Sequence, residues 1–287
     1  MLYWAHGKML MSNANPPCAG PVAVISDVHL AWRRHWRRRV DRLRPLWAGA
    51  EKVVFNGDTL DRTTSARPAK AGEVLDHIRR CCAGDGAEAV FLAGNSDFDT
   101  IGTDHLILAD GGVLVTHGHV VLPAMCPWRN TARNLHRARQ EALAQLPPDR
   151  RDTLAGQLAA ARAGLVNGQA PLDPRSRDGL MPVLRLWSFA HRPDRILSVL
   201  RTWRDTPPMA AQFLRRYCPQ ARVVLIGHTH RPGVWRIDER WVINTGSPRS
   251  PWRPLVARVQ GRTITVRRTR RRAGQLHPGP TLAEITI

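Results

Sequence analysis

Residues 21–29 have the sequence Pro-Val-Ala-Val-Ile-Ser-Asp-Val-His, a short apolar run that stops abruptly at polar side chains. Such a run, rich in β-branched residues, is typical of a buried strand that delivers a loop to the edge of a sheet. The loop carries Asp27 and His29, whose side chains are of the types that bind metal ions. On an extended segment, the Asp-x-His spacing places both side chains on one face.

The same pattern, an apolar run followed by a polar loop with a candidate metal ligand, recurs along the chain. The further runs are residues 53–55, 89–93, 113–115 and 223–226. The loops that follow them add Asp58, Asn95, His117, His228 and His230. Because loops at the carboxyl ends of strands converge in open α/β sheets, we expect these distant residues at one site.

The remaining patterns predict an α/β fold. Helix-like stretches around residues 32–47 and 69–82 separate the first three strands, as in a layered α/β protein. Two hairpin patterns, over residues 106–115 and 234–243, indicate antiparallel strands after the parallel set.

Residues 123–221 contain almost no strand pattern and predict several helices, broken by prolines at 147–148, 171–174 and 207–208. From about Arg258 the pattern predicts one or two strands, followed by the basic run Arg267–Arg272 and a Gly/Pro-rich stretch that we expect to be loosely ordered. The predicted organisation is an N-terminal extension (1–20), a catalytic domain (21–122 and 222–266), a helical insertion or cap (123–221) and a basic C-terminal tail (267–287).

The composition indicates anionic partners. The formal net charge is +20, and nearly all positive charge is arginine. Five cysteines without a Cys-x-x-Cys spacing favour reduced thiols in the cytoplasm over a disulfide framework. No apolar stretch of about 18 residues exists, so a membrane-spanning helix is not expected, although peripheral contact with the inner membrane face stays open. No obligate protein partner is evident.

The ordered motifs resemble those of the calcineurin-like metallophosphoesterase superfamily. They are Asp27-Val28-His29, Gly57-Asp58, Gly94-Asn95, His117-Gly118-His119 and Gly227-His228-Thr229-His230. The resemblance covers about residues 21–122 and 222–266 and implies a four-layer αββα sandwich. It also implies that one divalent ion is held by Asp27, His29 and His230, a second by Asn95, His117 and His228, and that Asp58 bridges both. Mn²⁺ is the first expectation, and Fe, Zn, Mg or Ni would also suit these ligands.

A metal pair of this kind lowers the pKa of a bridging water towards neutrality and neutralises phosphoryl charge, so we expect a phosphohydrolase that uses a hydroxide nucleophile. The expected catalytic residues are Asp58, Asn95, His117 and His119. Many superfamily members carry a leaving-group histidine where Ser96 stands here. A serine hydroxyl is too weak an acid for that role, so either His119 assists or the leaving group departs unaided, as from an anhydride or an aryl phosphate.

Three stretches, Gly94–Phe98, Thr116–His119 and Gly227–Pro232, are similar to the branch that contains UDP-2,3-diacylglucosamine pyrophosphatases. Those enzymes carry a helical cap that accommodates lipid, which implies a nucleotide-sugar or lipid diphosphate substrate. That branch usually has arginine at the position of Ser96. The segment 123–221 contains sixteen arginines, no lysine and seven acidic residues, together with Trp128, Trp187, Trp203 and Phe189. This mixture suits an amphipathic ligand or a membrane surface, or an ordinary helical subdomain with a basic face.

The substrate-binding candidates are Arg33, Arg34, Arg37 and Ser96, which lie close in sequence to predicted ligands. An exposed basic helix is the alternative for the three arginines. Two other functions stay open. A nuclease or cyclic-nucleotide phosphodiesterase would use the charge of +20 to bind nucleic acid. A non-catalytic scaffold is disfavoured, because a scaffold has no need for seven converging ligands.

Overall fold

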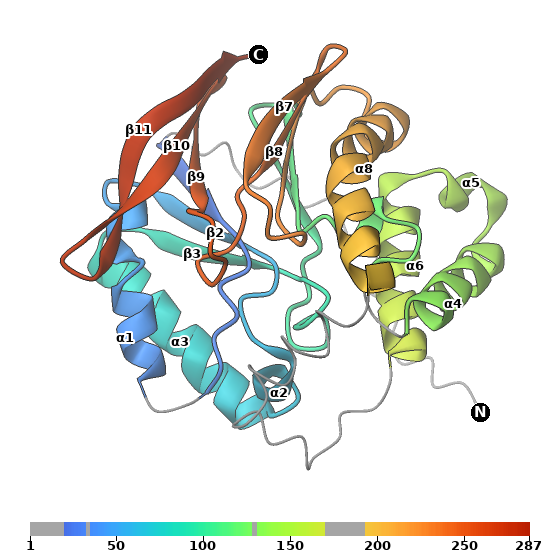
Figure 1. The fold of residues 1–287 in the computed structure, drawn as a ribbon, viewed down its shortest axis with the longest axis horizontal. Helices are drawn as coiled ribbons and strands as arrows, with labels where there is room; N and C mark the ends of the chain where they lie inside the picture. The colour runs from blue at the N-terminus through green and yellow to red at the C-terminus, as the bar shows by residue number, and fades with distance from the viewer. Residues whose placement is uncertain (1–19, 33–34, 128–130, 170–192) are drawn as a thin grey trace.

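The structure is a computed structural model that describes residues 20–32, 35–127, 131–169 and 193–287. Two β-sheets face each other, and helices cover the outer face of each sheet (Figure 1). The four-layer αββα architecture expected from the sequence is therefore confirmed. Arg33 and Arg34, most of the N-terminal extension and the prolines at 171–174 lie outside the described residues.

The first sheet has six strands in the order β11-β10-β9-β1-β2-β3. Their bounds are β1 (Val22–Ile25), β2 (Lys52–Asn56), β3 (Glu88–Leu92), β9 (Leu255–Gln260), β10 (Thr263–Arg272) and β11 (Gln275–Thr286). Strands β1, β2 and β3 are parallel, whereas β9, β10 and β11 continue the sheet in antiparallel pairs. The three parallel strands therefore end at one common edge.

The second sheet has five strands in the order β4-β5-β6-β8-β7. Their bounds are β4 (His105–Leu108), β5 (Val113–Thr116), β6 (Val223–Ile226), β7 (Gly233–Ile237) and β8 (Arg240–Asn244). The parallel core is β5-β6-β8, and each edge strand pairs antiparallel with its neighbour. Both predicted hairpins, over 106–115 and 234–243, are confirmed as β4-β5 and β7-β8.

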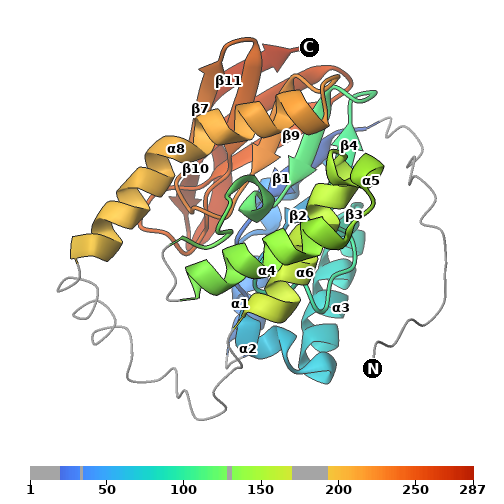
Figure 2. The ribbon, with the colours of Figure 1, turned by 90° about the vertical axis from the view of Figure 1, so that its right-hand side faces the viewer.

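The helices occupy the two outer layers (Figure 2). Their bounds are α1 (Trp36–Asp41), η1 (Arg44–Trp47), α2 (Arg62–Ser65), α3 (Pro68–Gly84), η2 (His119–Val121), α4 (Ala132–Gln145), α5 (Pro148–Arg151), α6 (Leu154–Gly168) and α8 (Pro193–Tyr217). Both early helical predictions are confirmed, the first as the pair α1 and η1. Within the described ranges, the helices are too short or too polar to cross a bilayer.

Three apolar clusters fill the three spaces between the layers. Trp47, Phe55 and Ile78 belong to the cluster between the first sheet and helices α1 and α3. A second cluster, with Val24 and Val115, joins the two sheets. The third packs residues of α4, α6 and α8 against the second sheet and includes Leu135, Leu165, Leu214 and Val242. The described parts of the segment 123–221 thus supply the outer helical layer on that side.

The prediction of a loosely ordered Gly/Pro-rich stretch after Arg272 is wrong, because this stretch forms β11, which pairs with β10. Val266, Thr269 and Ile285 are at most 4% exposed, while the arginines around them face solvent. The pairing register shifts between Val266 and Arg267 and again before Thr269. These shifts break the alternation of buried and exposed residues. The sequence therefore shows a run of charged residues without the period of two that identifies a strand.

The predicted break at Pro207-Pro208 is also wrong, because α8 continues through both prolines. A proline within a helix lacks the amide that would bond the carbonyl four residues earlier, which for Pro207 is that of Trp203. Here the guanidinium of Arg231 donates to this carbonyl at 2.9 Å. A contact from a distant loop therefore replaces the missing helical hydrogen bond. The break at Pro147-Pro148 is confirmed, since α4 ends at Gln145 and α5 begins at Pro148.

Candidate metal centre

The loops that carry the predicted ligands meet at the carboxyl ends of the parallel strands. Backbone hydrogen bonds join the loops in pairs. In the first sheet, the amide of Asp27 donates to Gly57 O at 3.1 Å and that of His29 to Asp58 O at 2.8 Å. In the second sheet, the amide of Gly227 donates to His117 O at 2.9 Å. These backbone hydrogen bonds fix the loops relative to one another without any contribution from the side chains.

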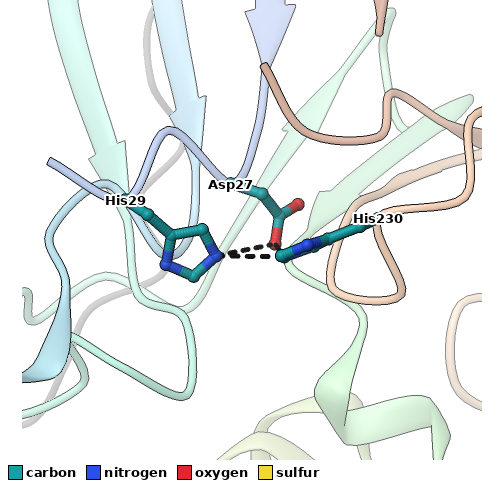
Figure 3. A group of neighbouring side chains, drawn as sticks. All are labelled: Asp27, His29 and His230. Atoms are coloured by element: carbon teal, nitrogen blue, oxygen red, sulfur yellow. Dashed lines mark hydrogen bonds and ion pairs between the residues drawn. The ribbon is translucent and has the colours of Figure 1, made fainter. Parts of the chain in front are cut away.

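Asp27 lies at the centre of the cluster and is fully buried. Its Oδ1 is 3.2 Å from His230 Nε2 and 3.9 Å from both His29 Nε2 and His117 Nε2. The Nε2 atoms of His29 and His230 are themselves 3.0 Å apart (Figure 3). Oδ1 accepts no hydrogen bond from the described atoms, whereas Oδ2 accepts one from the amide of His228. An unsatisfied buried carboxylate oxygen among imidazole nitrogens is costly without a cation, so the donor set fits a divalent metal.

Asp58 faces both halves of the cluster. Its Oδ2 is 3.6 Å from His29 Nε2, and its Oδ1 is 3.6 Å from His117 Nε2. The amide of Ser96 donates to Oδ1 at 2.7 Å and the Ser96 hydroxyl to Oδ2 at 2.9 Å. One carboxylate thus points an oxygen at each histidine while a neighbouring loop holds both oxygens in place.

The three remaining ligand candidates are Asn95, His117 and His228, and hydrogen bonds orient the two imidazole rings. His117 Nδ1 donates to Asn56 O at 3.0 Å, so its Nε2 faces the cluster and lies 3.2 Å from Asn95 Oδ1. His228 Nε2 donates to Met125 O at 2.6 Å, and its ring centroid lies 5.1 Å from that of His117. Carbonyl partners of this kind fix the tautomer and the direction of metal-binding histidines.

Glycines in the motifs make room for ligands from other loops. A Cβ at Gly57 would lie 2.4 Å from the His117 ring, one at Gly94 2.1 Å from Asp58 Oδ1, and one at Gly227 2.1 Å from Asp27 Oδ2. Real Cβ atoms essentially never come this close. The glycine of each motif is therefore required by the side chain of a different motif.

Five of the seven predicted ligands adopt a left-handed backbone that residues other than glycine rarely use. The φ angles are 54° for Asp27, 48° for His29, 48° for Asp58, 69° for His228 and 56° for His230. This conformation costs about 1–2 kcal/mol per residue, and such residues concentrate at functional sites. Five of the strained residues in the described part of the chain are therefore predicted ligands, as is typical of functional loops.

The two carboxyl groups stay ionised despite their burial. Burial raises the pKa of Asp27 and of Asp58, but the neighbouring histidines, His117 first, bring both below their ordinary value. For the pKa of His117, burial and the neighbouring charges act in the opposite directions. Burial lowers its pKa, but Asp58 and Asp27 raise it above the ordinary value. Burial and then Asp58 raise the pKa of Asp97 to about 7, and its oxygens accept from the amides of Gly94 and Leu60, as expected of a residue that supports a turn.

His119 lies beside the cluster in η2. Its ring centroid is 5.6 Å from that of His117, and its buried Nδ1 has no hydrogen-bond partner among the described atoms. Burial, followed by His117 and His228, holds the pKa of His119 well below the ordinary value. The imidazole is therefore neutral at physiological pH.

The substrate-binding candidates are placed differently. Ser96 is buried, and its hydroxyl is bound to Asp58. Arg37 lies in α1, where it donates to Glu73 Oε1 at 2.6 Å and covers the Trp36 ring at 4.6 Å. Arg37 is thus held by α3 and by its own helix.

Several supporting residues were missed from the sequence. Gln169 Nε2 donates to Asn95 O at 2.9 Å, and Trp203 Nε1 donates to Thr229 O at 3.0 Å. With Met125, they connect the helical segment to the site at three points. Arg249, from the loop after β8, donates to His29 O at 3.2 Å. Only Asn56 had a sequence signal, as a polar residue that ends a strand beside Gly57-Asp58.

The chain is thus an α/β two-sheet sandwich with buried carboxylate, imidazole and amide donors at one edge, a donor set that suits a divalent metal. The model of the calcineurin-like phosphoesterase family matches residues 20–232, and the chain belongs to this family. No curated protein matches the sequence.

Solved structures with a similar fold include three of low sequence identity. A dimetal phosphatase from Danio rerio is 14% identical, with 93% of this chain and 99% of that chain covered and a TM-score of 0.48. A predicted phosphoesterase from Streptococcus pneumoniae is 17% identical, with 93% and 98% covered and a TM-score of 0.40. Vps29 complexed with zinc from Entamoeba histolytica is 14% identical, with 93% and 98% covered and a TM-score of 0.42.

Proposed function

We propose that the protein is a dinuclear-metal phosphohydrolase that cleaves a phosphoanhydride or an activated phosphoester. The observation that carries the proposal is the position of Asp58, whose two oxygens face His29 and His117 separately at 3.6 Å. Asp27, His29 and His230 would hold one ion, and Asn95, His117 and His228 the other. His228 would use Nδ1, because its Nε2 donates to Met125 O.

Two divalent cations at such a site activate water and neutralise the charge of phosphoryl oxygens. The chain's contribution is to hold the ligands in a buried, preorganised arrangement. Asn56 aims the lone pair of His117 Nε2 inwards, and Ser96 fixes both oxygens of Asp58. Burial strengthens each electrostatic contact with a bound phosphate, because the local dielectric is low.

The surroundings of Ser96 support a substrate whose leaving group departs without protonation. The Ser96 hydroxyl already donates to Asp58, and His119 is buried as a neutral ring. Neither group offers an acidic proton, which favours diphosphates and aryl phosphates over simple alkyl esters. The likeness to the UDP-2,3-diacylglucosamine pyrophosphatase branch leads us to include nucleotide-sugar and lipid diphosphates among the substrates. Mn²⁺, a cytoplasmic location and contact with a membrane surface stay predictions.

Arg249 is our candidate for a substrate-binding residue among the described residues. Its guanidinium donates to His29 O at 3.2 Å, which brings a positive charge to the edge of the cluster. The residue is exposed, so the guanidinium stands between the cluster and solvent. A planar guanidinium suits a phosphate through paired hydrogen bonds.

The test is a screen of phosphomonoesters, phosphodiesters and pyrophosphates, nucleotide-sugar lipids included, with added Mn²⁺. We expect turnover that EDTA removes and Mn²⁺ restores. Asp58→Ala should lower kcat/KM at least about 10³-fold, because it removes the ligand shared by both ions. The matched control is Asp76→Ala, which removes an exposed carboxylate from α3 and should leave turnover unchanged. Full activity of purified Asp58→Ala protein would overturn the proposal.

A nuclease or cyclic-nucleotide phosphodiesterase is the second candidate, favoured by the net charge of +20. Nucleic-acid binding weakens steeply as salt rises, because bound counterions are released, whereas hydrolysis of a small diphosphate responds modestly. Turnover of oligonucleotides that falls steeply between 50 and 200 mM salt, with no turnover of diphosphates, would favour this candidate. A purified protein without stoichiometric metal, and without rescue by Mn²⁺, would instead indicate a scaffold.

A further inference from the structure

A hollow lies at the edge of the molecule opposite to the metal cluster. Its volume is about 740 Å³, and its walls are η1, the residues that precede β2 and β3, and strands β9, β10 and β11. Ala48 and Asp85 in its lining lie at the amino ends of β2 and β3, whereas the predicted ligands follow the carboxyl ends of strands. No lining residue is a predicted metal ligand, so this hollow is a separate feature.

The hollow continues along the sheet. A second hollow of about 410 Å³ shares Arg258 and Arg267 with the first and adds Gln260, Thr263 and Thr265. Arg258 lies on β9 and pairs with Thr265 of β10, and Arg267 lies two residues further along β10. The two hollows therefore form one groove on the outer face of these strands, which we call the basic groove.

The end of the β10-β11 hairpin closes the groove on one side. The amide of Leu276 donates to Arg42 O at 2.8 Å, which ties the start of β11 to the connection between α1 and η1. Trp47 Nε1 and Arg44 Nε donate to Asp85 Oδ2 at 3.0 and 2.9 Å, so η1 is fixed to the residues that precede β3. These hydrogen bonds tie β11 and η1, two walls of the groove, to the segments beside them.

The charges in the groove do not balance. Arg44 is neutralised by its paired hydrogen bonds to Asp85, the acidic residue in the lining. Arg258 is partly buried and donates to Ala48 O, and the exposed Arg267 stands beside it. Burial and then Arg267 lower the pKa of Arg258. Two like charges that share one face of a sheet repel each other, and a bound anion would offset that cost.

We propose that the basic groove binds a small anion that carries two or more phosphate groups, such as an inorganic oligophosphate or a nucleoside triphosphate. Guanidinium groups pair with phosphate oxygens through two parallel hydrogen bonds, and the threonine and glutamine side chains offer further donors. The volume is in the range of small-ligand sites, about 300–1,000 Å³. A small occupant is favoured because the groove ends at η1 and the hairpin.

Calorimetric titration of the full-length protein with tripolyphosphate tests the proposal. Arg258→Gln/Arg267→Gln removes the two lining charges that have no acidic partner among the described residues and should weaken tripolyphosphate binding at least tenfold. The matched control, Arg271→Gln/Arg272→Gln, removes two exposed charges from the same hairpin outside the groove and should change the affinity less than twofold. Orthophosphate should bind more weakly than tripolyphosphate. The single variant Arg267→Gln alters an exposed side chain and should lose part of the affinity without loss of fold.

The same titrations separate the sources of the ligand and the outcomes that overturn the proposal. Equal affinities for ATP and tripolyphosphate indicate that only the phosphates are recognised, whereas tighter binding of ATP indicates a nucleotide. Equal losses in the groove and control variants would mean general attraction to a basic surface. Loss of all binding in EDTA would place the anion at the metal centre. Ten-nucleotide oligothymidylate that binds tenfold more tightly than tripolyphosphate, with the same arginine dependence, would make the occupant a nucleic-acid strand.

Discussion

The packing of Gly94 against Asp58 makes a strong prediction about activity. An alanine Cβ at position 94 would lie 2.1 Å from Asp58 Oδ1 and 2.3 Å from the Asp58 backbone nitrogen, where an ordinary contact needs at least 3.4 Å. The backbone atom cannot turn away as a flexible side chain would. In Gly94→Ala, the carboxylate proposed to bridge both ions must therefore move by roughly 1.3 Å, from the difference between these distances.

A displacement of about 1 Å near a reacting centre costs about 10²-fold in rate. We therefore expect kcat/KM of Gly94→Ala to fall about 10²-fold or more, which corresponds to about 2.7 kcal/mol or more of transition-state stabilisation. The assay is hydrolysis of an aryl phosphate with Mn²⁺, together with the metal content and the circular dichroism of each protein. Metal content should fall with activity if Asp58 is the shared ligand that we propose.

Gly72→Ala is the matched control. Gly72 lies in α3, and a Cβ there has no atom within 4 Å. This variant should keep full activity and gain about 0.5–1 kcal/mol of stability, because alanine favours a helix more than glycine does. If folded Gly94→Ala kept its turnover and metal content within threefold of wild type, the reasoning about the cluster would be refuted.

Three other predictions concern contacts that do not involve the motif glycines. Arg231→Gln should lower the free energy of unfolding by about 1.5–3 kcal/mol in urea titrations, and by less in a Pro207→Ala background, which restores an amide donor to the Trp203 carbonyl; equal losses in both backgrounds would contradict this. The hydrogen bond from Arg44 lowers the pKa of Asp85, so the stability that the pair contributes is present above the ordinary pKa of 3.8 and lost as pH falls through the folded value. The urea midpoints of wild type and Asp85→Asn should therefore converge in acid, and a constant difference would oppose this account. Arg249→Met should raise KM for an aryl phosphate about tenfold or more, with metal content unchanged, and an unchanged KM would remove Arg249 from substrate binding.

The cluster of candidate ligands could be predicted from the sequence because each candidate lies in the loop that follows an apolar strand. That signal is local: the run Val223–Ile226 and the Gly-His-Thr-His that follows it are contiguous. Parallel strands end at a common edge, so one rule of sheet geometry is enough to bring Asp27, Asn95 and His228 together. The contacts of Met125 and Gln169 could not be found in this way. Met125 contributes its backbone carbonyl and Gln169 a side-chain amide, and no sequence pattern identifies such groups as contacts of a site.

Sequence proximity was a poor guide to which described arginine lies beside the cluster. Arg37 follows His29 closely along the chain, but α1 carries it to Glu73 of α3. Arg249 is 220 residues away from His29 and reaches its carbonyl because the loop after β8 returns to the same edge. The part of β10 from Arg267 onward was missed for a different reason, since two register shifts remove the alternation that identifies a strand.

The three hydrogen bonds from Met125, Gln169 and Trp203 limit how this protein can be re-engineered. Each of the three joins the helical segment to a different residue of the site loops: His228, Asn95 and Thr229. A chimaera that receives the corresponding segment of a relative must therefore reproduce an acceptor and two donors at these points. Shuffling between members of the family should succeed where these three junctions are kept and fail where only the length and helicity of the segment are matched.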